Sequence, residues 1–295
     1  MRIYNIGALN IDYVYNVTHF VRPGETLGVD MFDVFPGGKG LNQSIALKKA
    51  GADVVFCGCI GDDGSFLVKV LQEAGLDDTH VRRKDTPSGH TIIQVDESGQ
   101  NSILLYAGAN HCIDMSDIET ALKGAKSGDM LLLQNEINGL PEIFALAHKK
   151  GLQIVFNPSP FHDNIWELPL EYVGLWLLNE TEGRALSGRS ETKEILNTLQ
   201  ERYPGSRILL TLGDQGSVFR DGNQEFSQPV FPVKAADTTG AGDTYTGFFL
   251  ASLAEGRPVT EAMRRAVAAS AIVVSRMGAA SAIPSLDEVR EFLEK

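Results

Sequence analysis

The chain has 295 residues, 43% of them apolar and 22% charged, which is the balance of a globular protein long enough to build a sizeable core. Its 26 basic and 38 acidic residues give a net charge of −12, which argues against a nucleic-acid partner because such binding needs clustered Lys and Arg. The apolar runs are far shorter than the roughly 20 residues of a membrane span, and polar residues follow the first strand too early for a signal peptide. We therefore expect a cytoplasmic protein that binds neither nucleic acid nor membrane.

Cysteine and glycine carry further information. The three cysteines, Cys57, Cys59 and Cys112, lack zinc spacing, and two lie in an apolar run, so we expect all three to be reduced and in or near the core. Glycine is the compositional outlier, with 30 residues against an average of about 7%. The places where glycines cluster are therefore the first to inspect.

Short apolar segments rich in β-branched residues alternate with segments of helical periodicity, which predicts a parallel sheet covered by helices. In chain order, the expected strands are residues 2–7, 53–60, 129–133, 153–157, 173–178 and 207–212. The expected helices are residues 41–50, 65–74, 141–150 and 245–254, and Ser285 with Glu288 forms a capping box at the start of the last helix.

Two stretches, residues 12–35 and 89–106, lack helical periodicity and are typical of extended ribbons, the second turning back at residues 96–99. They predict a small antiparallel sheet outside the main α/β body. A further hairpin is expected at Asp221-Gly222. No linker rich in Pro, Gly and Ser separates these parts, so we expect a single domain over residues 1–295.

The strongest local signal is the sequence Asp-Thr-Thr-Gly-Ala-Gly-Asp at residues 237–243, directly before a helix. A Gly-Ala-Gly turn that opens a helix directs backbone N–H groups and the positive helix end at one point, which suits a phosphate. Asp243 would serve as a helix cap in the simplest interpretation. A carboxylate crowded against an anion-binding turn is better explained as the general base of a phosphoryl transfer, and we favour that interpretation.

A second glycine turn, Gly37-Gly38-Lys39-Gly40, also enters a helix. It is not a Walker A loop, because Lys39 is followed by Gly40 rather than by Ser or Thr. Glycines alone would indicate only a flexible turn. Lys39, Asn42 and Gln43 place three polar side chains at the opening of an otherwise apolar helix, and this cluster predicts contacts with several hydroxyl groups.

Other polar residues follow expected strands, where ligands of open α/β sheets bind. Asn10 and Asp12 follow the first strand, with local backbone bonding as an equal alternative. Glu182 is either a favourable charge in a first helical turn or an indirect ligand of Mg²⁺. Asn157, before Pro158, indicates a rigid turn.

Together, the two glycine signatures resemble those of the PfkB carbohydrate kinase family, also called the ribokinase family. Five supporting motifs occur in the family's order and spacing: Asn10-x-Asp12, residues 61–64, residues 107–110, residues 179–182 and residues 211–213. The resemblance covers essentially the whole chain. It implies a doubly wound, mostly parallel α/β fold with a small β lid, formed by about residues 12–35 and 89–106, that covers a sugar and often clasps a second subunit. A homodimer is therefore expected.

The resemblance also implies an ATP-dependent sugar kinase. Asp243 would deprotonate a sugar hydroxyl, and the N–H groups of Gly240, Ala241 and Gly242 would form the anion hole for the γ-phosphoryl group. The residues implied to bind the sugar are Asn10, Asp12, Gly38, Lys39, Asn42, Glu136 and Asp243. The residues implied to bind ATP are Asn179, Thr211, Leu212, Gly213, Asp214, Gln215, Gly216, Gly242 and the start of the helix that contains Val267.

Two kinds of metal are implied as well. Glu182 would organise Mg²⁺ through water. K⁺ would bind beside the anion hole, and the matching positions are Asp237, Thr239, Val273, Arg276, Gly278 and Ala282. Ala282 stands where the pattern has a serine, so one oxygen ligand is absent, and Val267 replaces a histidine of the adenine pocket.

The set Asn10, Asp12, Lys39, Asn42 and Glu136 is complete for a ribose-type sugar. This favours phosphorylation of D-ribose to ribose 5-phosphate, or of a related furanose. Ile93 and Tyr106 in the lid would also admit a base, so a nucleoside kinase is the alternative. A non-catalytic sugar or nucleotide sensor is a third interpretation, and the presence of Asp243 weighs against it.

Overall fold

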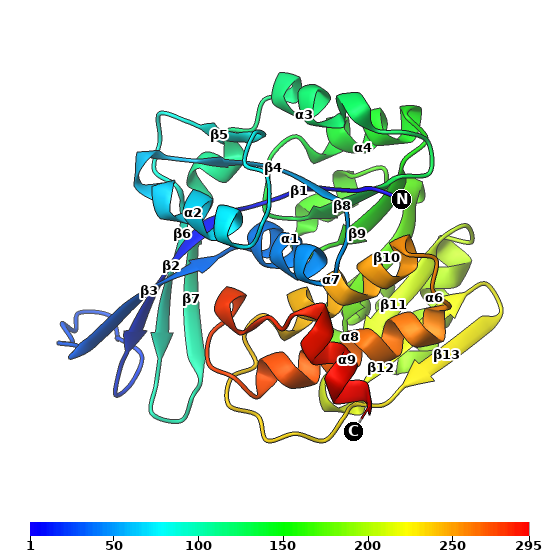
Figure 1. Cartoon of the computed structure of the whole chain (residues 1–295). Coiled ribbons are helices and arrows are strands. Elements are labelled where there is room, and N and C mark those ends of the chain that lie inside the picture. The colour runs from blue at the N-terminus through cyan, green and yellow to red at the C-terminus, as the bar shows by residue number, and fades with distance from the viewer. Residues whose placement is uncertain (295) are drawn as a thin grey trace.

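A nine-stranded sheet lies between two layers of helices in the computed structural model, which describes residues 1–294 (Figure 1). Its strands are β1 (Ile3–Ile6), β4 (Val54–Ile60), β5 (Val81–Arg83), β8 (Met130–Gln134), β9 (Gln153–Asn157), β10 (Val173–Asn179), β11 (Arg207–Thr211), β12 (Ser217–Asp221) and β13 (Gln224–Gln228). The order is β13-β12-β11-β10-β9-β8-β1-β4-β5. Neighbours from β11 to β5 pair in parallel, whereas β12 and β13 form an antiparallel hairpin at one edge.

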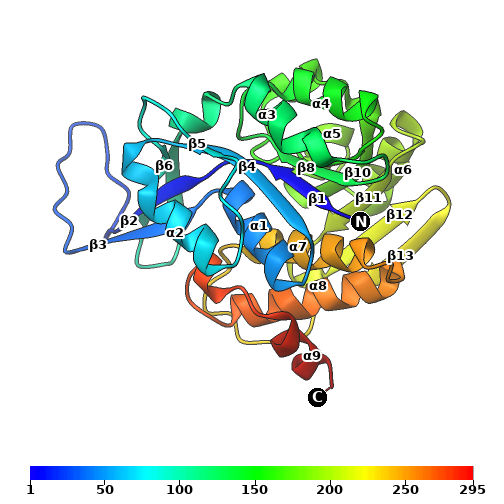
Figure 2. The same cartoon turned by 45° about the horizontal axis from the view of Figure 1, so that its top comes forward.

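The helices divide between the two faces of this sheet (Figure 2). One layer contains α1 (Lys39–Lys49), α2 (Ser65–Glu73), α7 (Ala241–Ala254), α8 (Val259–Val274) and α9 (Leu286–Glu294). The other contains α3 (Met115–Ala121), α4 (Leu140–Lys149), α5 (Glu180–Ser187) and α6 (Thr192–Arg202). Consecutive strand residues serve opposite cores, as with Leu131 and Leu132 of β8, because strand side chains alternate between faces. No helix among residues 1–294 has the length and hydropathy that a bilayer crossing needs.

A four-stranded sheet, the lid sheet, projects from one end of the α/β body (Figure 1). Its strands are β2 (Asn10–Asn16), β3 (Met31–Gly37), β6 (Gly89–Val95) and β7 (Asn101–Tyr106), in the order β3-β2-β6-β7. The outer pairs are antiparallel, as expected, but β2 and β6 pair in parallel, which corrects the expectation of an antiparallel sheet. The reason is that both strands leave the body at the same edge and run outward. Residues 17–30 form no strand, so the first ribbon is shorter than predicted.

The predicted strands and helices of the body are present, and their ends differ by at most two residues, except that α7 begins at Ala241, four residues before the predicted start. The hairpin at Asp221-Gly222 is confirmed, as is the capping box: the Glu288 N–H donates to Ser285 Oγ and the Ser285 N–H donates to Glu288 Oε2. All three cysteines are free thiols. Cys57 and Cys59 are buried, but Cys112 is exposed, because it follows a surface 3₁₀ turn rather than a strand.

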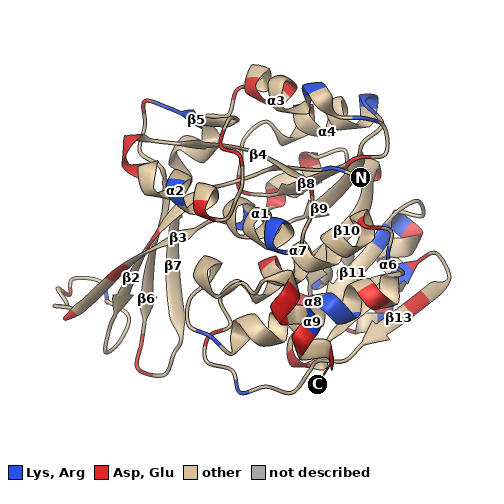
Figure 3. Ribbon diagram, in the orientation of Figure 1, with Lys and Arg blue, Asp and Glu red and all other residues tan. Residues whose placement is uncertain are grey.

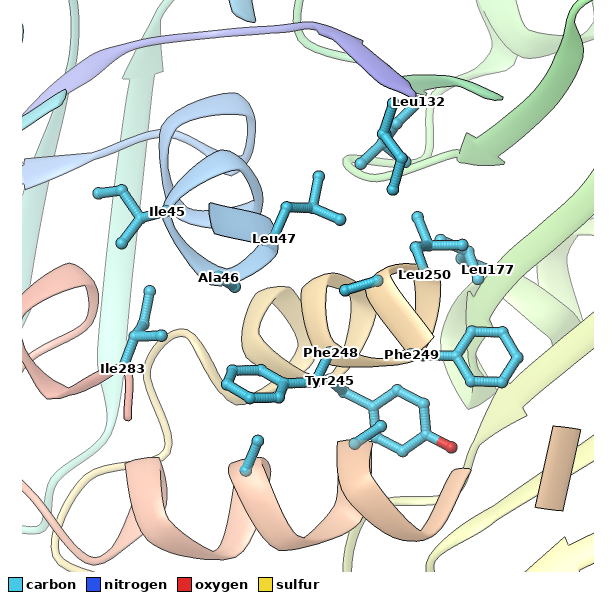
Figure 4. Close-up of a cluster of buried hydrophobic side chains, with 14 of the residues drawn as sticks. Ile45, Ala46, Leu47, Leu132, Leu177, Tyr245, Phe248, Phe249, Leu250 and Ile283 are labelled. Carbon is cyan, nitrogen blue, oxygen red and sulfur yellow. The ribbon is translucent and has the colours of Figure 1, made fainter. Parts of the chain in front are cut away.

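Helices α1 and α7 cross in close contact below the sheet (Figure 4). A Cβ atom added at Gly247 would lie 2.3 Å from the Cβ of Ala46, so only glycine allows this approach. Tyr245, Phe248 and Phe249 fill the space beside the crossing. The crossing brings the N-terminal halves of the two helices together, and both glycine signatures lie at these helix starts.

Candidate active site

The two glycine signatures meet at the carboxylate of Asp243. This side chain is 7% exposed and lies in the first turn of α7. Its Oδ1 accepts a hydrogen bond from Gln43 Nε2 at 2.9 Å, and its Oδ2 accepts one from Asn42 Nδ2 at 3.2 Å. Two segments about 200 residues apart in the chain therefore form one site.

Lys39, Glu136 and Asp12, which are expected to bind the sugar, form a cluster of charge with Asp243. The Lys39 N–H donates to Glu136 Oε2 at 2.9 Å. Burial raises the pKa of Glu136 to about 7, with Asp243 and Asp12 adding to the rise and Lys39 opposing it. Burial lowers the pKa of Lys39, but the nearby Asp243, Glu136 and Glu182 outweigh burial and raise that pKa overall. The lysine therefore stays charged among carboxylates.

Asn10 and Asp12 lie two positions apart on β2, so their side chains point to the same side. Asn10 Oδ1 accepts a hydrogen bond from Asn110 Nδ2 at 2.8 Å, and Asp12 Oδ1 accepts one from Thr91 Oγ1 at 2.6 Å. Burial and Asp243 raise the pKa of Asp12 to about 6, against the hydrogen bond from Thr91. A hydrogen bond from a neighbouring residue therefore fixes each of these two side chains, and each has a further polar atom with which to bind a ligand.

The turn before α7 has the features of an anion-binding site. Gly240 has a φ of 75°, a left-handed conformation that favours glycine, and it precedes the first helical residue. Helix geometry leaves the first N–H groups without intrahelical acceptors. A Cβ atom added at Gly242 would meet no protein atom within 4 Å, so protein packing does not require glycine here. The open space at Gly242 belongs to the cavities beside it.

Two adjoining cavities lie on either side of this turn. The inner cavity, of about 150 Å³, is lined by Lys39, Asn157, Asn179, Glu182 and Asp243 among others. The outer cavity, of about 520 Å³, has a largely apolar wall that includes Val230, Phe231, Val233, Val267 and Val274. Thr211, Thr238, Ala241, Gly242 and Tyr245 line both.

The predicted nucleotide residues divide between these cavities. Thr211, Gly213, Asp214, Gly216, Gly242 and Val267 line the outer cavity, and Asn179 lines the inner one. Leu212 and Gln215 line neither. Val267 lies in the middle of α8 and not near its start. The expectation that the start of this helix contributes to the nucleotide site is therefore wrong, because α8 presents its middle and C-terminal half, including Val274, to the outer cavity.

Glu182 and Asn179 form a complete capping box at the start of α5. Glu182 Oε2 accepts from the Asn179 N–H at 2.9 Å and Oε1 accepts from Asn179 Nδ2 at 3.0 Å. Burial raises the pKa of Glu182, against the hydrogen bond from Asn179. Among residues 1–294, no three His, Cys, Asp or Glu side chains gather into a direct metal cage. A carboxylate fixed in this way at the inner cavity suits Mg²⁺ held through water.

The residues implied to bind K⁺ gather behind the anion turn. Asp237 Oδ1 accepts from the Thr239 N–H, and Asp237 Oδ2 accepts from the Gly278 N–H. At the end of α8 and in the segment after it, the carbonyls of Val273 and Ala282 accept from the N–H and the Nη1 of Arg276, respectively. Carbonyl oxygens can accept more than one partner, so this part of the chain still offers oxygens to a cation.

The structure also revises two expectations and adds a residue. Gln43 is fully buried and bonds only to protein groups, so it is not available to sugar hydroxyls. Asn157 is more than part of a turn, because its Oδ1 accepts from Gln43 and its Nδ2 donates to the Leu177 carbonyl. Asn5 was not predicted, although an Asn inside an apolar strand was a visible signal. Asn10 and Glu136 also border a third cavity of about 390 Å³.

Comparison with known proteins places this site in context. The model of the pfkB family of carbohydrate kinases matches residues 2–286. The chain is 37% identical over 300 residues to the ribokinase of Haemophilus influenzae, covering 98% of this chain and 97% of that protein. The solved ribokinase of Thermotoga maritima has a TM-score of 0.88 at 35% identity and covers 100% of both chains. The ribokinase of Arabidopsis thaliana complexed with ribose and ATP has a TM-score of 0.88 at 26% identity, covering 100% of this chain and 99% of that one.

Proposed function

Because the chain belongs to the pfkB family of carbohydrate kinases, we propose that it transfers the γ-phosphoryl group of ATP to a hydroxyl of D-ribose and gives ribose 5-phosphate. The observation that carries the proposal is the position of Asp243. Its carboxylate lies in the first turn of α7, held by two amides, where the anion turn meets the sugar-side cluster.

In this mechanism, Asp243 accepts the proton of the attacking sugar hydroxyl as the new P–O bond forms, while the bond from the γ-phosphorus to the oxygen that bridges to the β-phosphate breaks and ADP leaves. The N–H groups of Gly240, Ala241 and Gly242 donate hydrogen bonds where negative charge builds on the transferring group. Asn10, Asp12, Gly38, Lys39, Asn42 and Glu136 hold the other hydroxyls of the sugar. Binding the acceptor in one orientation supplies much of the rate enhancement.

The two cavities support the assignment of the nucleotide. The apolar outer cavity suits a purine, and the inner cavity beside the helix start suits the phosphates. Glu182 would hold Mg²⁺ through water, and the ion supplies neutralisation of the phosphate charge when it is bound.

An ADP-release assay with a panel of acceptors tests the proposal. We expect turnover with D-ribose and slower turnover with hexoses and with nucleosides, which are included because of the third cavity beside Asn10 and Glu136. Asp243→Asn should reduce kcat by at least about 1,000-fold while ATP still binds, as shown by calorimetry. Absence of turnover with every acceptor would indicate a sensor, and near-normal turnover of the variant would exclude Asp243 as the base.

We also propose that K⁺ binds at Asp237, Thr239, Val273, Arg276, Gly278 and Ala282 and stimulates the reaction. The gathering of these residues behind the anion turn supports this site. Rates in K⁺ and in tetramethylammonium at equal ionic strength provide the test. We expect faster turnover in K⁺ for the native protein and equal rates for Asp237→Ala; equal rates for the native protein would contradict the proposal.

The quaternary structure and location of the enzyme are further parts of the proposal. We propose a homodimer that forms through the lid sheet, because β3 and β7 expose a row of large apolar side chains. We propose the cytoplasm as its location, since its three free thiols are typical of a reducing compartment.

A further inference from the structure

A chain of buried amides connects the Asp243 carboxylate to the carboxyl ends of the central strands. Gln43 Nε2 donates to Asp243 Oδ1 at 2.9 Å, and Gln43 Oε1 accepts from Gln134 Nε2 at 2.7 Å. Gln134 Nε2 also donates to Asn5 Oδ1 at 3.0 Å, and Asn5 Nδ2 donates to Ser44 Oγ at 2.8 Å and to the Gly40 carbonyl at 2.9 Å. Gln43, Gln134 and Asn5 are all fully buried.

The chain has a fixed direction. Gln134 Nε2 is a donor shared by two oxygens, so Gln43 must turn its oxygen toward Gln134 and its nitrogen toward Asp243. The other hydrogen bond of Gln43 Nε2 goes to Asn157 Oδ1 at 3.2 Å, and Asn157 is itself held by the Leu177 carbonyl. Residues of four adjacent strands, β1, β8, β9 and β10, thereby orient one amide group that faces the carboxylate.

The arrangement is not the one that would best stabilise the fold. Gln134 Oε1 is buried and has no hydrogen-bond partner in the part of the chain that the structure describes. An unsatisfied buried oxygen destabilises the folded state, whereas an apolar side chain of the same size would not. The space for this oxygen depends on Gly7, since a Cβ there would lie 2.3 Å from it. Gly7, which directly follows β1, and the amide of Gln134 are thus fitted to each other at the expense of stability.

We propose that Gln43 and Gln134 are positioning residues of the phosphoryl transfer, which hold the Asp243 carboxylate in the orientation that accepts the proton of the sugar hydroxyl. Neither residue contacts the sugar. Gln43 acts on Asp243 directly, and Gln134 acts only through Gln43. This inference rests on the proposed kinase function, because a base must be oriented only if it accepts a proton.

The test uses methionine substitutions, which keep the length and nearly the volume of glutamine and remove its amide. We expect Gln43→Met and Gln134→Met each to lower kcat roughly 10- to 100-fold, with the KM for ATP changed less than about twofold. The double variant should lose no more than Gln43→Met alone, since the two residues act in series. Both variants should show a larger solvent deuterium isotope effect on kcat than the native enzyme, because proton transfer becomes slower.

Gln200→Met is the matched control, because Gln200 is a partly buried amide of α6, outside the site. Among residues 1–294 it bonds only to the backbone carbonyls of residues 203, 204 and 206. It should leave kcat and the isotope effect unchanged. If Gln43→Met does not fold, Gln134→Met alone decides the question. A kcat of Gln134→Met equal to that of the control, or additive losses in the double variant, would overturn the inference. Absence of turnover by the native enzyme would instead contradict the proposed function.

Discussion

Among residues 1–294, Lys39 is the one lysine that lines the inner cavity, and the carboxylates of Asp243, Glu136 and Glu182 all act on it. The carboxylates raise its pKa more than burial lowers it, so the lysine stays charged and its charge is balanced by carboxylates of the protein. Little positive charge then remains at the site for the polyphosphate of ATP. Helix N-termini and Mg²⁺ must supply the remainder.

Removal of this charge should therefore affect the sugar more than the nucleotide. Lys39→Ala should raise the KM for ribose by at least about tenfold and leave the Kd for ATP within about threefold, because Asp243 and Glu136, two of the three carboxylates that it balances, are proposed to bind the sugar. Steady-state kinetics and calorimetry measure the two quantities. Lys48→Ala, an exposed lysine of the same helix, is the control and should match the native enzyme. A larger effect on ATP than on ribose would remove Lys39 from the sugar site.

The raised pKa of Glu136 should appear in the pH dependence of stability. Burial raises this pKa from 4.5 to about 7, so the folded state binds a proton more tightly than the unfolded state does. The stability that the proton contributes is complete below about pH 4.5 and is lost as the pH rises through about 7. In the absence of sugar, the free energy of unfolding should therefore fall more between pH 5 and pH 8 in the native protein than in Glu136→Gln.

Urea denaturation at each pH measures this difference. Glu142→Gln, which alters an exposed carboxylate in the first turn of α4, should retain the native pH dependence. Equal slopes for native protein and Glu136→Gln would show that Glu136 is ionised over the whole range.

At the scale of the elements, the site depends on where helices begin. Helices α1 and α7 each follow a glycine turn, and their close crossing at Gly247 and Ala46 sets the distance between Asn42 and Asp243. The charges in Figure 3 lie largely on the outer helices and loops, while this crossing is apolar. Two glycines of α7 therefore have different roles: Gly247 allows the close packing against α1, and Gly242 leaves open space for the ligand.

These roles predict opposite results for two substitutions on the same helix. Gly247→Ala should destabilise the protein by about 1–3 kcal/mol, because the added methyl group overlaps Ala46. Gly242→Ala should leave stability unchanged or raise it by up to about 1 kcal/mol, since alanine favours a helix and meets no protein atom. Its methyl group enters the space of the phosphate, so kcat should fall at least about tenfold. Thermal unfolding and ADP release separate the two; equal losses of stability would contradict this assignment.

The sequence predicted helices α1, α2, α4 and α9 because their ends carry local signals. Gly51, Gly75 and Gly151 end helices, and Ser285 with Glu288 begins one, all through interactions within a few residues. The parallel pairing of β2 and β6 has no such signal, since strand pairing joins distant segments. The sequence also did not predict that the middle of α8, at Val267, lines the outer cavity, because tertiary packing decides which part of a helix is left uncovered.

At the scale of the whole molecule, the lid sheet differs from the acidic α/β body. Strands β6 and β7 carry no Lys, Arg, Asp or Glu (Figure 3). Ile103, Leu104, Leu105 and Tyr106 are all at least 45% exposed. A patch of this kind on a small sheet is typical of a protein interface, and the net charge of −12 would otherwise keep copies apart.

If the lid sheet forms the dimer, a charge in this patch should prevent association. Leu104, which is 65% exposed, is the best position because its substitution leaves the core intact. Sedimentation equilibrium should give a dimer mass for the native protein and a monomer mass for Leu104→Asp. Met277→Asp, at an exposed apolar residue outside the lid sheet, should remain a dimer. A monomeric native protein would exclude the proposed dimer.

The sequence by itself determined the class of fold, the order of most elements, the two glycine signatures and Asp243 as the central residue. These follow from periodicity, helix ends and short motifs, which depend on residues close together in the chain. Only the tertiary structure decided that Gln43 faces Asp243 rather than the sugar, that Asn5 and Gln134 support it, and that residues 230–233 form part of the wall of the outer cavity. The hydrogen bonds of Gln43 with Asp243 and of Gln134 with Gln43 and Asn5 join residues 200, 91 and 129 positions apart, and the packing of helices on the sheet alone sets them.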